Sequence, residues 1–105
     1  MTIAINMPCC FLFRLGSIVA TPGALEATTE ARRLDCLARH AIGEWGCVGG
    51  DDWQSNDDAV KNGDRILSAY PIAVRQPCEG FGENTLWIIT EADRSVTTFL
   101  LPSEY

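Results

Sequence analysis

Cys36 and His40 are the residues whose types and spacing most resemble a catalytic arrangement. They lie four positions apart in a stretch of good helix formers, so on a helix they would share one face. A thiol beside an imidazole is how a nucleophilic cysteine is activated, which makes a thiol enzyme one hypothesis. The same positions adjoin an apolar stripe that a helix would bury, and the chain holds a single histidine. We therefore expect the pair to serve in packing and on the surface, and we predict no catalytic residues.

Two groups of carboxylates could also carry chemistry. The acidic residues of 51–58 lack the alternate spacing, central glycine and terminal glutamate with which a calcium loop holds its cation. Glu91 and Asp93 flank a turn beside Arg94, where no cleft would raise a carboxyl pKa for acid–base work. We expect Asp93 to hydrogen-bond its own backbone and Arg94 to be solvated. A phosphate-cradling glycine loop, a nucleophile elbow and a dinucleotide fingerprint are absent from the sequence, so we predict no metal, no cofactor and no enzymatic activity.

The charge of the chain is concentrated in one segment. Of the net charge of −6, residues 43–64 contribute −5, from six acidic residues and one lysine. No basic stripe that could neutralise phosphates occurs, so we expect no direct binding to nucleic acid. An acidic patch suits a protein partner with a basic surface, although a solvated loop is the alternative. Tryptophans amid acid can form a hot spot against an arginine-rich surface, or can simply seat the loop on the domain. The predicted partner-binding residues are Glu44, Asp51, Asp52, Trp53, Asp57 and Asp58.

Length and composition indicate one soluble domain over residues 1–105. Of the 105 residues, 47% are hydrophobic and 21% are charged, which is ordinary globular usage. The apolar first twenty residues have no positive n-region, and Arg14 interrupts the run before it could span a bilayer. Five cysteines without a CxxC pair indicate neither a zinc site nor a disulfide framework. We expect a cytoplasmic protein without membrane contact, in which residues 1–10 form an extra strand or a loosely held extension.

The elements that must position these residues begin with a strand and a helical segment. Residues 11–20 are rich in strand formers and end at Thr21, which can cap a helix that has Pro22 in its first turn. Good helix formers follow over 24–42, and residues 28–29 are a point where one helix can become two.

A second helical region follows the glycine-rich loop. Asp51 or Asp52 can cap a helix that runs to about residue 62, where Gly63 would end it. Its apolar content is thin, so we expect a surface helix with one edge docked on the domain.

The rest of the chain alternates strands and loops. Strand character appears over 64–70, 85–90 and 95–101, and the loop 71–83 holds two prolines and two glycines. The last two strands form a hairpin, and all three suggest an antiparallel meander. The predicted fold class is α+β: a small antiparallel sheet of three to four strands, with a C-terminal hairpin, packed with one to three helices.

Several segments together resemble a known family. The matching segments are residues 15–24, 37–40, 44–46, 66–70, 87–98 and 100–102. With these segments the chain is similar to short bacterial proteins that are carried on plasmids and other mobile elements and are called plasmid-related proteins or type I restriction methylation subunits. The resemblance covers most of residues 15–105, and its final run is specific. The chain departs from the family pattern before Phe11, in the loop 47–50 and in the insertion 71–83.

The resemblance implies that the protein comes from a mobile element, but it does not by itself imply an enzymatic activity. A methylation subunit is several times longer and needs a cofactor loop and an Asn-Pro-Pro-aromatic motif, and neither occurs here. Small acidic proteins of mobile elements often block host defences that act on nucleic acid. We therefore expect a non-enzymatic inhibitor, of the anti-CRISPR or anti-restriction kind, that binds a basic surface of a CRISPR or restriction nuclease. The alternatives are a plasmid-maintenance protein that acts as a homodimer or larger homo-oligomer, and a small thiol enzyme built on Cys36 and His40.

Overall fold

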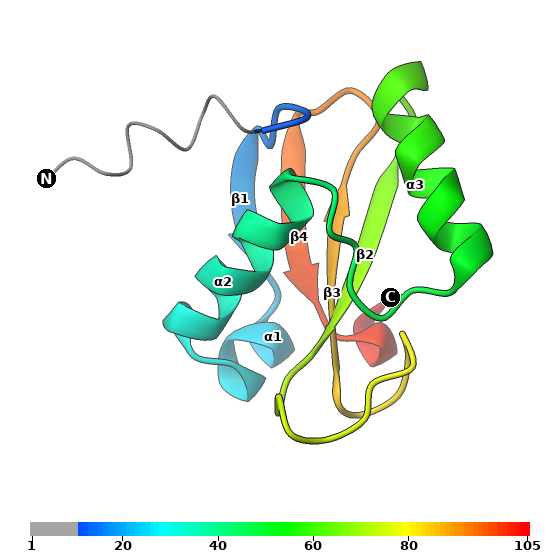
Figure 1. Cartoon of the computed structure of the whole chain (residues 1–105). Coiled ribbons are helices and arrows are strands. Elements are labelled where there is room, and N and C mark those ends of the chain that lie inside the picture. The colour runs from blue at the N-terminus through cyan, green and yellow to red at the C-terminus, as the bar shows by residue number, and fades with distance from the viewer. Residues whose placement is uncertain (1–10) are drawn as a thin grey trace, which may run out of the picture.

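The structure, a computed structural model, describes residues 11–105 of the chain, and the predicted extension over 1–10 lies outside the described residues. The three α-helices of the described residues lie between the first and second strands, and the last three strands follow them; this confirms the α+β class and places the helices against one small sheet (Figure 1). The elements are β1 (Ser17–Ala20), α1 (Pro22–Ala27), α2 (Glu30–Ala41), α3 (Gly50–Asn62), β2 (Ile66–Pro71), β3 (Thr85–Thr90), β4 (Val96–Leu100) and the 3₁₀ turn Pro102–Glu104.

The sheet has the strand order β1-β4-β3-β2. Strands β2, β3 and β4 form the predicted antiparallel meander, with Ser68 opposite Ile88 and Thr90 opposite Thr97. Strand β1 pairs with β4 in parallel, so the prediction of an antiparallel sheet is wrong for this strand and the sheet is mixed. Parallel strands need a long crossover connection, and the helical segment between β1 and β2 carries the chain across the sheet to its opposite edge.

Local signals set most helix ends. The Thr21 side chain accepts a hydrogen bond from the backbone of the first turn of α1, and the Thr29 side chain caps α2, so the predicted break at 28–29 is confirmed. Helix α3 ends at Gly63 in the left-handed conformation, as predicted. Its N-cap is Gly49 without a side-chain bond, so the predicted aspartate cap is wrong. The two aspartates at 51 and 52 lie in the first turn, where a carboxylate interacts favourably with the helix dipole.

Two buried clusters form the core. The first lies between the sheet and helices α1 and α2, and the second joins α3 to the segment before β1. Trp45 is fully buried in the second cluster. The first cluster contains Ala24, Cys36, Tyr70, Leu86, Ile88 and Phe99. The second contains Phe13, Trp45, Ala59 and Ile66, with Trp53 and Val60 packed against it.

A chain of polar groups crosses this apolar interior. The fully buried His40 of α2 has Nδ1 2.6 Å from the Ser68 hydroxyl of β2 and Nε2 2.8 Å from the Thr90 hydroxyl of β3. Thr90 lies 2.8 Å from the Thr97 hydroxyl of β4, which donates to the backbone carbonyl of Leu15 at 2.7 Å. One imidazole therefore connects a helix to three strands and to the segment before β1.

The last bond in this chain sets the direction of the others. The Leu15 carbonyl can only accept, so Thr97 donates to it and must accept from the Thr90 hydroxyl. Thr90 then accepts from Nε2–H of His40, so the network places a proton on Nε2. In the neutral imidazole, Nδ1 therefore accepts from the Ser68 hydroxyl.

The surroundings of His40 disfavour its charged form. The rings of Phe13 and Trp45 lie edge-on to the imidazole, with centroids 5.3 and 5.7 Å away. Burial, and secondarily the positive charge of Arg94, lower the pKa of His40 from 6.5 to about 3. The side chain is therefore neutral in the folded protein near neutral pH.

The turn between β3 and β4 is bound to α3. Arg94 was expected to be solvated, but it is half-buried and donates to the carbonyls of Asp64, Ala59 and Glu91. Its guanidinium also lies 5.4 Å from the centroid of the Phe13 ring. One arginine therefore joins the β3–β4 turn to the end of α3, at the Asp64 carbonyl and at the Ala59 carbonyl, which also accepts from the Gly63 backbone.

Strand β2 lies at the sheet edge, but its backbone is covered. The Asn56 side chain bonds both backbone groups of Leu67, and the backbone of residues 45–47 bonds both backbone groups of Ala69. At Gly46 the backbone has φ of 79°, and a Cβ there would collide with the Ala69 carbonyl oxygen. The opposite edge strand, β1, has β4 as its one neighbour among the described strands.

The buried imidazole predicts a pH-dependent stability. Below pH 6.5 the unfolded chain takes up a proton on His40 that the folded protein excludes, so stability falls as pH falls from 6.5 towards 3. Urea unfolding should therefore give a free energy lower by about 2 kcal/mol at pH 5 than at pH 7.

The variant His40→Leu supplies the control for that measurement. It should lose about 2–4 kcal/mol at pH 7, because the hydroxyls of Ser68 and Thr90 lose a buried partner, and its stability should vary less between pH 5 and 7. Equal pH dependence in the two proteins would contradict the assignment.

Candidate functional site

Helix α3 carries five of the six predicted partner-binding residues, but it distributes them over different sides. Asp51 and Asp58 are seven residues apart, so they share the exposed outer face. Asp52 is exposed and borders a pocket between α3 and the 79–81 loop. Asp57 is half-buried and faces Trp45. The four aspartates therefore do not form one flat patch: they point to different sides of α3.

Asp57 has a structural task. Its carboxylate accepts a hydrogen bond of 2.9 Å from the indole Nε1–H of the fully buried Trp45. Trp53 is half-buried and packs against the same core cluster, so much of its ring holds α3 on the domain. These two residues seat the helix, whereas Asp51, Asp52 and Asp58 remain exposed.

Glu44 lies on the connection that leads to α3. One carboxylate oxygen accepts from the Gly46 backbone at 3.2 Å, and the other lies 3.4 Å from the Arg39 guanidinium. Its backbone carbonyl accepts from the Tyr70 hydroxyl. The charge of Glu44 is therefore already paired within the chain, so it is less available to a partner than the exposed aspartates.

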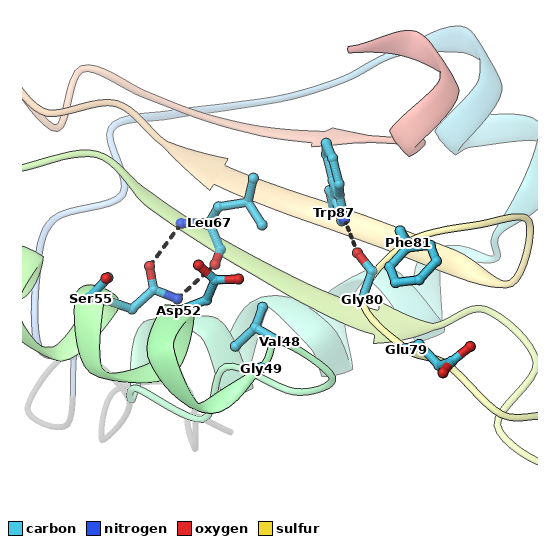
Figure 2. Close-up of a pocket in the computed structure, with 10 residues that line it drawn as sticks. Val48, Gly49, Asp52, Ser55, Leu67, Glu79, Gly80, Phe81 and Trp87 are labelled. Atoms are coloured by element: carbon cyan, nitrogen blue, oxygen red, sulfur yellow. Dashed lines mark hydrogen bonds between the residues drawn. The ribbon is translucent and has the colours of Figure 1, made fainter.

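A pocket of about 480 Å³ opens beside α3 (Figure 2). Leu67 of β2 and Trp87 of β3 line it from the sheet, and α3 borders it on one side. The 79–81 loop, which carries Phe81, borders it on the other side. Phe81 is 66% exposed, which is unusual for a phenyl ring of this size. The remaining lining residues are Val48, Gly49, Asp52, Ser55, Asn56, Glu79 and Gly80.

Hydrogen bonds hold both walls of this pocket in place. Both ends of the Asn56 amide are taken by the Leu67 backbone, and Trp87 Nε1–H donates to the Gly80 carbonyl at 2.7 Å. The preceding part of the loop is closed by Asn84, whose amide bonds backbone groups at residues 73, 76 and 77. The pocket is therefore formed before any ligand arrives.

The charge of the pocket is negative. Asp52 and Glu79 lie in its lining, and none of the ten lining residues is basic. The ion pairs found among residues 11–105 lie elsewhere: Arg32–Asp35, Arg39–Asp35, Arg39–Glu44 and Arg65–Glu91. Two carboxylates therefore face solvent here without an ion-pair partner within the described chain.

Asp52 could be predicted from the sequence, but the residues that join it could not. Trp87 lies in an apolar strand, a pattern typical of the core, yet it is half-buried and lines the pocket. Glu79 and Phe81 lie in a loop without periodicity. An exposed phenylalanine in a loop of prolines and glycines was the available signal, but nothing local connects it to α3.

The thiol hypothesis finds no support in the geometry. Both ring nitrogens of His40 bond hydroxyl groups, so neither is free to take the Cys36 proton. Burial raises the pKa of the Cys36 thiol to about 11, and burial and a hydrogen bond with Cys78 raise that of Cys47 to about 12. Thiolates are therefore scarce at neutral pH. Within residues 11–105, no group of three histidine, cysteine or acidic side chains is placed to hold a metal ion.

No helix in the described part of the chain has the length and apolar character needed to cross a bilayer.

The bond between Asp57 and Trp45 can be tested by two substitutions. Asp57→Ala should lower the free energy of unfolding by about 1–3 kcal/mol, because the buried indole N–H loses its acceptor. Asp57→Asn retains an acceptor oxygen and should cost less than about 1 kcal/mol. Urea unfolding followed by tryptophan fluorescence measures both. If the two variants were equally unstable, the hydrogen bond would not be the cause.

Comparison of the chain with protein-family models, with curated proteins and with solved structures gives no match.

Proposed function

We propose that this protein is a non-enzymatic inhibitor that binds a basic surface on a nucleic-acid-targeting defence nuclease, of the CRISPR or restriction kind, through the α3 side of the domain. The observation that carries the proposal is the group of exposed carboxylates on α3, at Asp51, Asp52 and Asp58, which form no ion pair within residues 11–105. The exposed Phe81 lies at the pocket that Asp52 borders. Negative charge next to an apolar anchor is the chemistry that recognises a basic protein groove.

The rigidity of α3 supports this role. The helix is fixed by the Asp57–Trp45 bond, by Asn56 on the β2 backbone and by Arg94 at its end. Carboxylates on a fixed helix lose little conformational freedom on binding, so they can occupy the positions of phosphates on a nuclease at a small entropic cost. The opposite charge also accelerates encounter with the partner and makes binding sensitive to salt.

The class of partner comes from the resemblance to mobile-element proteins. Elements that move between hosts meet restriction and CRISPR nucleases, whose nucleic-acid channels are basic. An acidic domain can block such a channel without catalysis. This agrees with the buried, high-pKa thiol of Cys36 and with the neutral, fully hydrogen-bonded His40, since neither offers a reactive group.

The proposal predicts a charge-dependent interaction. The triple variant Asp51→Asn, Asp52→Asn, Asp58→Asn should bind the captured nuclease at least about tenfold more weakly, a loss of about 1.4 kcal/mol. Its affinity should also depend less steeply on salt. Pull-down from a lysate with active CRISPR and restriction systems, followed by titration calorimetry of the captured protein, measures both.

A matched variant tests the location of the binding surface. The substitutions Glu26→Gln, Glu30→Gln and Glu83→Gln remove the same charge from exposed positions away from α3. They should leave the affinity within about twofold. Equal weakening by both triple variants would show that net charge alone matters, and an unchanged affinity of the aspartate variant would overturn the proposal.

A second candidate function is a homodimer that acts in plasmid maintenance. The observation that favours it is the edge strand β1, where Ile18 and Val19 are each 45% exposed. Leu25 and Leu34 lie beside them and are 51% and 58% exposed. An apolar edge strand is a surface that another copy of the chain can pair with.

Sedimentation of the purified protein discriminates the two functions. The homodimer predicts a dimer at micromolar concentration that becomes monomeric in Val19→Lys, because a lysine on an edge strand opposes pairing. The inhibitor proposal predicts a monomer in both proteins.

A further inference from the structure

We propose that the pocket between α3 and the 79–81 loop receives an arginine side chain of the partner protein. This inference rests on the proposed function and deepens it by naming the group that the acidic surface recognises. It is carried by the residues that line the pocket (Figure 2). These include the aromatic Phe81 and Trp87, and the carboxylates of Asp52 and Glu79, which form no ion pair within residues 11–105.

The polar inventory of the pocket favours a cation. Both ends of the Asn56 amide hydrogen-bond the Leu67 backbone, and the Trp87 N–H donates to the Gly80 carbonyl, so neither is free for a ligand. The side-chain groups left for a ligand are the carboxylates of Asp52 and Glu79 and the hydroxyl of Ser55. An anion would meet two like charges there, and a neutral apolar group would cover carboxylates without pairing them.

The apolar part of the lining favours arginine over lysine. A guanidinium is planar and weakly hydrated, so it stacks on aromatic faces while its N–H groups bond carboxylates. Phe81 and Trp87 provide aromatic surface, and Leu67 and Val48 provide contacts for the aliphatic stem. A lysine ammonium is a compact, strongly hydrated charge that gains less from such surroundings.

The pocket is also prepared for its ligand. It has a volume of about 480 Å³, which exceeds one side chain and so leaves room for the partner backbone to approach. The Trp87–Gly80 bond fixes the indole, and the Gly80 backbone packs on Cys47, where an added Cβ would lie 3.1 Å from the Cys47 carbonyl oxygen. Because the walls are set in advance, little ordering accompanies binding.

The test uses small probes in place of the partner. Agmatine carries the arginine guanidinium and 1,5-diaminopentane carries the lysine ammonium, each with a second, terminal ammonium. The third probe, 4-aminobutylurea, keeps that ammonium and replaces the guanidinium with a planar head without charge. Each probe is titrated into the ¹⁵N-labelled full chain, and the Trp87 indole N–H resonance reports the pocket. Agmatine should give a saturable shift in the millimolar range, with at least about threefold weaker binding of the other two probes.

Two matched double variants locate the carboxylates. Asp52→Asn with Glu79→Gln should weaken agmatine binding at least about fivefold. Glu26→Gln with Glu30→Gln removes the same charges from exposed residues that do not line the pocket, and it should leave the binding within about twofold.

The results separate this inference from the function on which it rests. An agmatine shift that does not saturate, equal binding of 4-aminobutylurea, or equal loss in both double variants would overturn the arginine pocket. Diaminopentane binding as tightly as agmatine would overturn the preference for arginine. The probes are measured without a nuclease, so the failure of the partner pull-down leaves this result intact. A charge-dependent partner that binds while agmatine does not would keep the function and reject the pocket.

Discussion

The fold depends on one buried imidazole that must stay neutral. His40 joins α2 to the three strands of the meander through Ser68 and Thr90, and through Thr97 to the segment before β1. The residues that carry these hydroxyls are fully buried, so the arrangement is stable only when every donor is hydrogen-bonded to an acceptor within the protein. The direction of the hydrogen bonds, which starts from the Leu15 carbonyl, places a proton on Nε2, and burial keeps the imidazole neutral. The residue that looked most catalytic in the sequence is thus the residue that organises the interior.

The position of α3 follows from that interior. The His40 ring is edge-on to Trp45, and the indole N–H of Trp45 donates a hydrogen bond to Asp57 on α3. Asn56, one residue earlier, bonds the backbone of β2 and covers the edge of the sheet. With these two contacts fixed, helical periodicity places the remaining aspartates outward or towards the pocket, and Asp52 comes to face the loop that carries Phe81. The acidic surface is therefore a consequence of core packing, although its charges contribute little to stability.

Features that depend on neighbouring residues could be predicted from the sequence. The helix start at 21–22, the break at 28–29 and the helix end at Gly63 each follow from local capping chemistry. The parallel pairing of β1 could not be predicted, because it depends on where a long crossover returns the chain. The role of Arg94 depends on three carbonyls, two of them about thirty residues away in the sequence. The pocket likewise unites α3 with the 79–81 loop through tertiary contacts alone, so the sequence identified one of its walls and missed the other.

Site-specific photo-crosslinking in living bacteria tests most directly whether the α3 side meets a defence nuclease. A benzophenone amino acid at Ser55 reports the α3 side, and the same group at Leu25 reports the surface beside β1; both positions are exposed. The account predicts that Ser55 yields a cross-link to a CRISPR or restriction nuclease and that Leu25 does not. A cross-link from Leu25 to a second copy of the chain, with none from Ser55, would contradict it and favour the homodimer.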